Sequence, residues 1–210
     1  MDSRERKYRD PEKIRVYFLP GKDTVTMMEL FDRQTFLRHI VAALGRGVLV
    51  AVILPLIPVL LFSIPLTPTL ALIGSGLLIE YGAAPVGIAL GLSPLFVFYV
   101  LICTETGIFL GLYDIFDTIG HTWEPVMRFL EKSRLYVHQS ATIEKYGILA
   151  LVPCEILLGV YVNAPASWVL GWREEHALLV TMAAYCIALI ITIYLSIGLL
   201  QFSVPGLVLP

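Results

Sequence analysis

Hydrophobic residues come in long blocks along this chain, and charged stretches separate the blocks at the start, in the middle and near Arg173. Residues 47–66 form an apolar run of about twenty residues, the length needed to cross a hydrocarbon core of about 30 Å. Residues 95–116 and 177–200 form two similar runs. The pattern therefore predicts an all-α integral membrane protein with about three transmembrane helices.

Two further apolar segments, residues 66–94 and 147–172, are interrupted by glycine, proline and a glutamate. Irregular backbone at membrane depth is tolerated only where protein or water covers it. We therefore expect two re-entrant helical hairpins, one entering from outside and one from inside, which is the order of an inverted repeat. Six full crossings are the alternative, but each segment is short for two crossings of about 20 residues each. The predicted hairpin hinges are Gly82, Pro85, Pro153 and Gly159.

The charged segments predict how the chain is oriented in the membrane. Residues 1–46 hold ten of the fifteen Lys and Arg residues, and none lies between Gly47 and Met127. Because basic segments stay on the cytoplasmic side, we expect a multi-pass protein of the plasma membrane with a cytoplasmic N-terminus. Residues 117–146 carry four more basic residues and form the expected cytoplasmic bridge within a membrane domain at 47–210.

The N-terminal arm, residues 1–46, differs from the rest of the chain. Apolar side chains recur at helical spacing from Met27 to Leu44, and Thr26 with Glu29 has the spacing of a capping box. This predicts an amphipathic helix on the membrane surface. A helix packed on the soluble face of another subunit is an equally good interpretation. The expected partners are therefore the lipid bilayer and, through residues 1–46, other membrane subunits.

Composition agrees with the membrane class and argues against others. The chain is 57% hydrophobic, whereas soluble domains are about 45–50% apolar. It has no basic face suited to nucleic acid. Cys103, Cys154 and Cys186 all lie in apolar segments, and an odd number argues against a disulfide framework. No nucleophile elbow, phosphate-binding loop or dinucleotide fingerprint is present, so we expect neither an enzyme nor a cofactor.

Glu80, Glu105 and Glu155 are the only charged residues deep in apolar sequence. No Lys or Arg in these segments could pair with them, and an intramembrane acid indicates a functional site by default. Such groups could carry protons, coordinate a cation or attract a cationic substrate. The competing interpretation is that each is protonated or hydrogen-bonded in a packed bundle. Three acids in one small protein favour function, so we predict that they bind substrate or protons.

Two GxxxG patterns, Gly87–Gly91 and Gly107–Gly111, permit close contact between helices. Four polar residues downstream recur at helical spacing: Asp114, Asp117, His121 and Glu124. They could share one face that binds a metal. Such a stripe is more often the solvated side of an interfacial helix, so the sequence predicts no metal site.

Residues 82–94 read GAAPVGIALGLSP. They resemble the segment ELRGAIPLGIALGLPP of the small multidrug export family, which is related to the wider DedA-like group of membrane proteins. Residues 143–147 resemble that family's IEKYG, and residues 168–198 are similar to its closing span. The resemblance covers residues 78–198 and leaves the first 65 residues unexplained.

This resemblance implies two facing re-entrant hairpins and movement of lipid-linked or amphiphilic substrates, in many cases with protons. The chain departs from the family at the first hairpin, where the family's Glu falls at Ile79 and its Arg at Tyr81. The family's Asn in the next span falls at Glu105. The expected function is a transporter or lipid translocator. Because the hairpin motifs are changed, the alternative is a non-catalytic subunit of a larger membrane complex that keeps this fold.

Overall fold

The computed structural model describes residues 33–122 and 146–203. All regular structure in these two ranges is helical, and neither range contains a β-strand. The described residues from Arg38 onward belong to one compact unit. The expected capping box at Thr26, most of the predicted cytoplasmic bridge and Glu124 lie outside the described residues.

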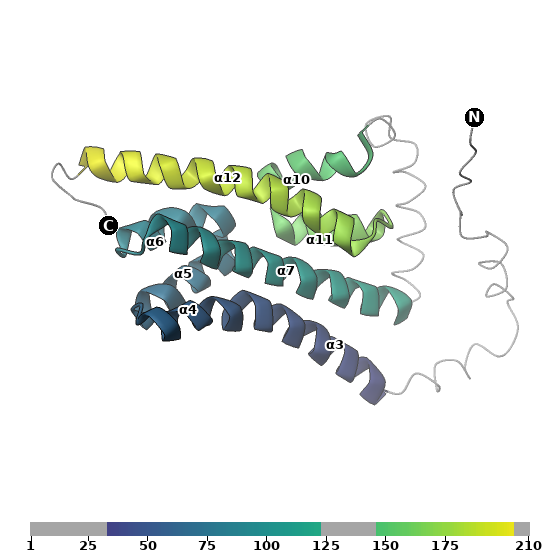
Figure 1. The fold of residues 1–210 in the computed structure, drawn as a ribbon. Coiled ribbons are helices and arrows are strands. Elements are labelled where there is room, and N and C mark those ends of the chain that lie inside the picture. The colour runs from purple at the N-terminus through teal and green to yellow at the C-terminus, as the bar shows by residue number, and fades with distance from the viewer. Residues whose placement is uncertain (1–32, 123–145, 204–210) are drawn as a thin grey trace, which may run out of the picture. The chain divides into compact units, whose positions relative to one another are not determined.

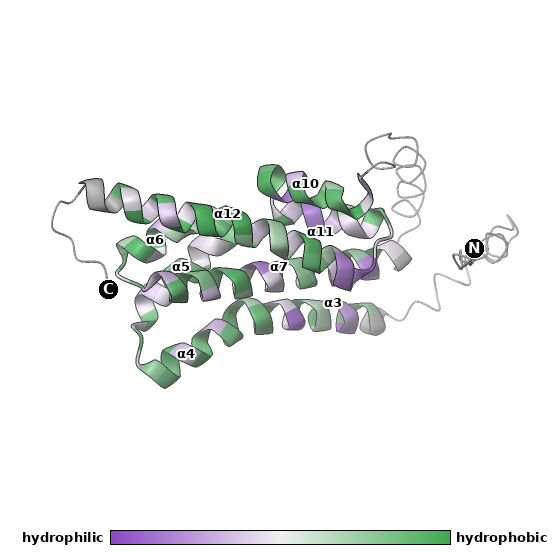
Figure 2. Ribbon diagram, turned by 45° about the horizontal axis from the view of Figure 1, so that its top comes forward, coloured by the Kyte–Doolittle hydropathy of each residue, from purple (hydrophilic) through white to green (hydrophobic). Residues whose placement is uncertain are grey.

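The first long helix consists of three consecutive segments: α3 (Arg33–Val48), η1 (Leu49–Ile53) and α4 (Leu54–Phe62). The η1 segment is a π-helical turn, and it directly precedes a helix with Pro55 in its first turn and Pro58 in its interior. Proline cannot donate a backbone hydrogen bond and bends a helix that contains it. Figures 1 and 2 show α4 turned away from the axis of α3.

The rest of the described chain forms two groups of helices. The first group is α5 (Leu66–Ile79), the short 3-10 turn η2 (Glu80–Ala83), α6 (Ala84–Ala89) and α7 (Pro94–Thr122). The second group is η3 (Gly147–Ala150), α10 (Leu151–Leu158), α11 (Val160–Val169) and α12 (Glu174–Ser203).

Four of the described helices are long and apolar enough to cross a membrane. They are Phe36–Phe62, Leu66–Ala89, Pro94–Gly120 and Glu174–Leu199. The first begins at Phe36 rather than at Gly47, and the second includes the segment that was expected to form a hairpin. Residues 147–158 form a shorter apolar helix. The predicted all-helical membrane class is confirmed at this level.

The outer surface is apolar, as lipid contact requires. Figure 2 shows hydrophobic residues along most of α4 and α12. Large side chains are almost fully exposed there and elsewhere, including Leu60 at 84%, Leu78 at 82% and Leu157 at 78%. Soluble monomers rarely expose apolar patches larger than a few hundred Å². This surface therefore indicates an integral membrane protein.

Helix α7 is the centre of the bundle. Of its most apolar stretch, 67% is buried, against 39% or less in the other three long helices. It packs against η1, α5, α6, α11 and α12, and Figure 1 shows it between α3 and α12. Val97, Val100, Leu101 and Phe109 on α7 are completely buried. Side chains on α7 can therefore meet groups from every other part of the bundle.

One of the two GxxxG patterns marks a close helix crossing. A Cβ atom added at Gly107 would overlap the backbone at Gly47 and Ala51, and one at Gly111 would lie 3.5 Å from the Cα atom of Gly47. The hydroxyl of Thr104 also donates to the Ala51 carbonyl oxygen at 3.3 Å. In the other pattern, a Cβ atom at Gly87 would lie 2.7 Å from the Val97 side chain, but Gly91 lies in a turn with φ +81°, where a Cβ would meet nothing within 4 Å.

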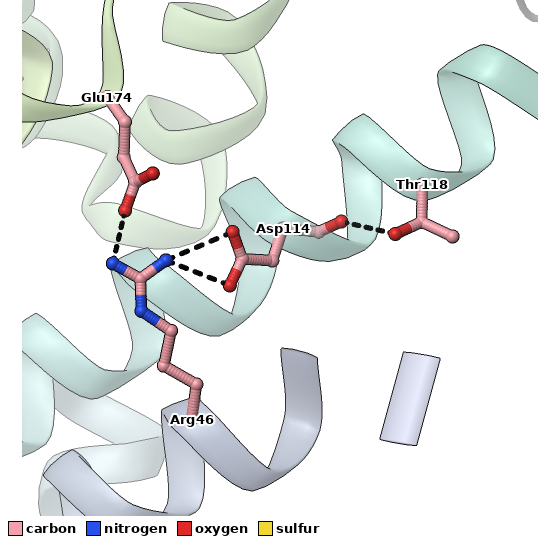
Figure 3. Close-up of polar contacts among 4 residues, drawn as sticks. All are labelled: Arg46, Asp114, Thr118 and Glu174. Atoms are coloured by element: carbon pink, nitrogen blue, oxygen red, sulfur yellow. Dashed lines mark hydrogen bonds and ion pairs between the residues drawn. The ribbon is translucent and has the colours of Figure 1, made fainter. Parts of the chain in front are cut away.

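A polar contact joins three helices at one end of the bundle (Figure 3). The Arg46 guanidinium of α3 lies 3.1 Å from Asp114 of α7 and 2.8 Å from Glu174 of α12. One turn along α7, Asp117 accepts a hydrogen bond from the Trp168 indole at 2.9 Å. Two members of the polar stripe predicted from the sequence therefore bind neighbouring helices. Partly exposed ion pairs contribute little free energy, about 0–1 kcal/mol each, so their main effect is on helix register.

Replacing Gly107 with alanine tests the close crossing. The added methyl group has no room, and overpacking costs about 1–3 kcal/mol. We expect Gly107→Ala to lower Tm in detergent by about 2–12 °C, at about 2–4 °C per kcal/mol for a chain of this size. The matched control is Gly74→Ala in α5, where a Cβ has no neighbour within 4 Å. Equal melting temperatures for the two variants would contradict the crossing.

Candidate functional site

The three acids singled out in the sequence meet inside the bundle. Glu80 begins η2, Glu105 lies in the middle of α7, and Glu155 lies in α10. Each supplies one carboxylate oxygen to a group whose members all lie within 4.8 Å of one another. Glu105 is 1% exposed and Glu155 is completely buried, while Glu80 is half-buried. Together they form one site, which we call the carboxylate cluster.

The break between α5 and η2 positions the Glu80 carboxylate. Glu80 has φ +52°, a left-handed conformation that is rare for residues other than glycine and costs about 1–3 kcal/mol. Its carboxylate accepts a hydrogen bond from the Val160 backbone N–H at 3.1 Å. Val160 is the first residue of α11, and the positive end of a helix dipole stabilises an anion there. Glu80, a strained residue at the break in the first segment, thus caps helix α11 of the second segment.

Gly159 leaves the space that Glu80 occupies. It separates α10 from α11 with φ +74° and ψ −177°, a conformation that is essentially restricted to glycine. A Cβ atom at Gly159 would overlap the Glu80 carboxylate. Of the four predicted hinges, Gly159 therefore lies at a helix break, the one between α10 and α11. The break after α5 falls at Glu80, which was not one of the predicted hinges. Gly82 lies in η2, and Pro85 and Pro153 lie in the first turns of α6 and α10.

Two tyrosines link the broken helices reciprocally. The Tyr81 hydroxyl donates to the Ile156 carbonyl oxygen of α10 at 2.9 Å. The Tyr161 hydroxyl, in α11, donates to the Leu77 carbonyl oxygen of α5. Both carbonyl groups belong to the last turn of a helix, where no intrahelical N–H is available to them. Tyr81 therefore supplies a donor to the last turn of α10, and Tyr161 supplies one to the last turn of α5.

Asn163 fixes the deepest part of the cluster. Its amide nitrogen lies 2.9 Å from the Glu155 Oε2 atom and 2.9 Å from the Thr181 hydroxyl. All three side chains are completely buried. Both carboxylate oxygens of Glu105, Oε1 of Glu155 and Oδ1 of Asn163 are buried without a hydrogen-bond partner. Such atoms are rare in native proteins, and each requires an explanation.

No described basic side chain forms an ion pair with the carboxylate cluster. Arg46 pairs with Asp114 and Glu174, and Arg173 pairs with Glu175. Three ionised carboxylates this close inside a protein are strongly unfavourable without compensation. Either protons or a cation must therefore neutralise most of their charge.

The cluster is closed to the two surface pockets found on the described part of the chain. One pocket lies around Trp172 and His176, and the other lies around Phe98 and Tyr194. None of the three glutamates lines either pocket. Of the three acids, Glu105 and Glu155 are covered by the surrounding helices, whereas Glu80 is half-buried.

Sequence reasoning did not identify every residue that builds this site. Asn163 could have been found by the rule that selected the glutamates, because it is a polar residue within an apolar run. Tyr81, Tyr161 and Thr181 carry no such signal, since tyrosine and threonine are common in membrane helices. Their importance depends on contacts between segments that lie far apart in the chain.

No family model, no curated protein and no solved structure matches the chain. The site is therefore interpreted from its own geometry.

Replacing Gly159 with alanine tests the contact between the two breaks. We expect Gly159→Ala to destabilise the protein more than Gly147→Ala, measured as Tm in detergent. Both glycines have positive φ, +74° and +53°, but only the first has the Glu80 carboxylate against it. The double variant Gly159→Ala/Glu80→Ala should recover part of the loss, as expected for groups in contact. Equal losses for the two glycine variants would contradict this contact.

Proposed function

We propose that this protein is a proton-coupled membrane transporter or translocator of amphiphilic molecules, with the carboxylate cluster as its proton-binding site. In this proposal α5, η2 and α6 form one re-entrant hairpin, and η3, α10 and α11 form a second hairpin from the opposite side. The observation that carries the proposal is that three uncompensated acids lie where two broken helices meet. Broken helices that meet near the midplane form the sites of many secondary transporters.

The dimensions of the first broken segment support a re-entrant hairpin. Helix α5 has 14 residues, about 21 Å at 1.5 Å per residue, which is short of a hydrocarbon core of about 30 Å. Helix α6 has 6 residues, and it packs against α5 as well as α7. The chain then turns at Gly91 and enters α7 at Pro94.

The contacts of the second broken segment support entry from the opposite side. Directly after α11, the Trp172 carbonyl oxygen accepts a hydrogen bond from the Tyr113 hydroxyl of α7 at 2.7 Å. Tyr113 lies about 19 residues beyond Pro94, or about 28 Å along the helix, which is close to the thickness of the hydrocarbon core. The reciprocal tyrosine contacts add support, because an inverted repeat relates its two hairpins in this way.

The end of the bundle at which Tyr113 contacts Trp172 also carries Arg173 and the ion pair between Arg46 and Glu174. Basic residues favour the cytoplasmic side. We therefore assign this end, and with it the N-terminus, to the cytoplasm of a plasma-membrane protein.

The proposed mechanism couples protonation to separation of the two hairpin tips. Proton binding neutralises the carboxylate cluster, which allows the tips to stay packed together. Loss of protons leaves like charges within 4.8 Å of one another, and their repulsion favours opening. Opening would break the Glu80–Val160 hydrogen bond and the two tyrosine contacts. The path for an amphiphilic substrate then lies between the tips, next to lipid.

A non-catalytic subunit of a larger membrane complex is the second candidate. The observation that favours it is the burial of Glu105 and Glu155, which line neither of the two surface pockets described above. Native purification in a mild detergent distinguishes the two functions. A subunit should co-purify with stable partners, attached through residues 1–46, whereas a transporter should be active alone.

Cysteine labelling tests the hairpin topology. In a variant without Cys103, Cys154 and Cys186, we expect Ser63→Cys and Ser93→Cys to react with an impermeant maleimide from the same side of the membrane. Gly147→Cys and Arg173→Cys should react from the other side. If residues 66–89 cross completely, Ser63→Cys and Ser93→Cys will instead be labelled from opposite sides, and the re-entrant arrangement is wrong.

Reconstitution tests the transport activity. We expect vesicles that contain the wild type to transfer a fluorescent phospholipid between leaflets faster when a pH gradient is imposed. Glu105→Gln preserves the shape of the side chain but cannot release a proton, so its rate should fall to that of protein-free vesicles. Glu175→Gln, an exposed acid outside the cluster, is the matched control and should keep the wild-type rate. Unchanged transfer by Glu105→Gln would remove Glu105 from the mechanism.

A further inference from the structure

We propose that the carboxylate cluster is a binding site for a hard divalent cation of the size of Ca²⁺. The inference rests on the site of the proposed function and names a ligand for it. Its test is direct binding to the purified protein, which needs no transport activity.

The spacing of the oxygen atoms fits an ion of this size. Oxygen ligands lie about 2.3–2.6 Å from Ca²⁺, so two oxygens on one ion are separated by about 5 Å at most. Glu80, Glu105 and Glu155 each supply an oxygen within 4.8 Å of the other two. Mg²⁺ holds its ligands at about 2.0–2.1 Å and retains several waters. A set of protein oxygens in a buried site is therefore better suited to the larger ion.

The donor atoms select the same class of ion. The three grouped side chains are all carboxylates. Oxygen donors favour Mg²⁺, Ca²⁺ and Mn²⁺, whereas Zn²⁺ and copper favour imidazole and thiolate. No histidine or cysteine among the described residues belongs to the group.

The unpartnered atoms are the second, independent observation. Asn163 is completely buried, and its amide nitrogen is bound to Glu155 Oε2 and Thr181. Its Oδ1 is buried without a hydrogen-bond partner. Both oxygens of Glu105 are also unpartnered. The Glu105 carboxyl lies close enough to Glu155 for the two to share a proton, and a single cation can bind oxygens from all three acids.

Charge balance predicts competition with protons. Three carboxylates and one divalent cation leave one negative charge, and the Val160 N–H and the N-terminus of α11 compensate part of it at Glu80. Metal ligands must be deprotonated to bind. The cation should therefore bind more tightly as the pH rises. It would also join η2, α7 and α10, and so stabilise the closed arrangement of the two breaks.

Equilibrium dialysis of the full-length protein in detergent with radioactive Ca²⁺ tests the site. We expect one ion per chain at pH 8, weaker binding at pH 6, and a higher Tm when Ca²⁺ is present. Glu105→Gln should lower the affinity at least about tenfold, because loss of even a supporting group costs about 10–100-fold. Glu175→Gln is the matched control and should bind as the wild type does.

Absence of binding by the wild type at about 1 mM free Ca²⁺, the weak end of protein calcium sites, overturns the inference. Wild-type affinity in Glu105→Gln also overturns it. If that variant does not fold, Glu80→Gln takes its place, since Glu80 is only half-buried. Calcium binding without transport would refute the proposed function alone. Transport without calcium binding would refute the cation site alone.

Discussion

The central constraint on this structure is the burial of three acids inside an apolar helical bundle. Burying one ionised carboxylate without a partner is already expensive, and Glu80, Glu105 and Glu155 lie close enough to oppose one another. The bundle does not offset this cost with a described basic side chain. It offers instead the N-terminus of α11, reached by Glu80, and the amide nitrogen of Asn163, reached by Glu155. Glu105 receives neither, so a proton or a cation is needed to neutralise its charge.

Helix breaks make this arrangement possible. A continuous helix satisfies its own backbone groups and offers an ion only side chains, whereas a broken helix exposes N–H and C=O groups at the break. Here the free groups of one broken segment are satisfied by the other, through Glu80, Tyr81 and Tyr161. Glu80 itself adopts a strained conformation. Strain of this kind persists only where the surroundings impose it, and it is concentrated at functional sites.

Much of the fold and the identity of the three acids could be predicted from the sequence. Long apolar blocks gave the helical membrane class, and acids without a counter-ion within those blocks pointed to one polar centre. The exact position of the first break could not be predicted, because Gly82 and Pro85 favour a break and Glu80 does not. The crossing at Gly107 could be proposed but not distinguished from the similar pattern at Gly87. Only contacts between distant segments show which glycines lie at a break or at a crossing. Such contacts can join residues 84 positions apart, as the hydrogen bond from Tyr161 to Leu77 does.

If the two broken segments are re-entrant hairpins, as proposed, the contacts between their tips limit how the tips can separate. Because the ends of α5 and α10 are satisfied across the interface, separating the tips leaves two backbone carbonyl groups and one carboxylate without partners. Each unsatisfied buried group costs about 1–3 kcal/mol, so the tips separate readily only if water or a substrate replaces those contacts. The charge of the cluster acts at the same place, and neutralising it removes the main force that opposes closure. In the proposed mechanism, ion binding and separation of the two breaks are therefore coupled, whether the ion is a proton or a metal.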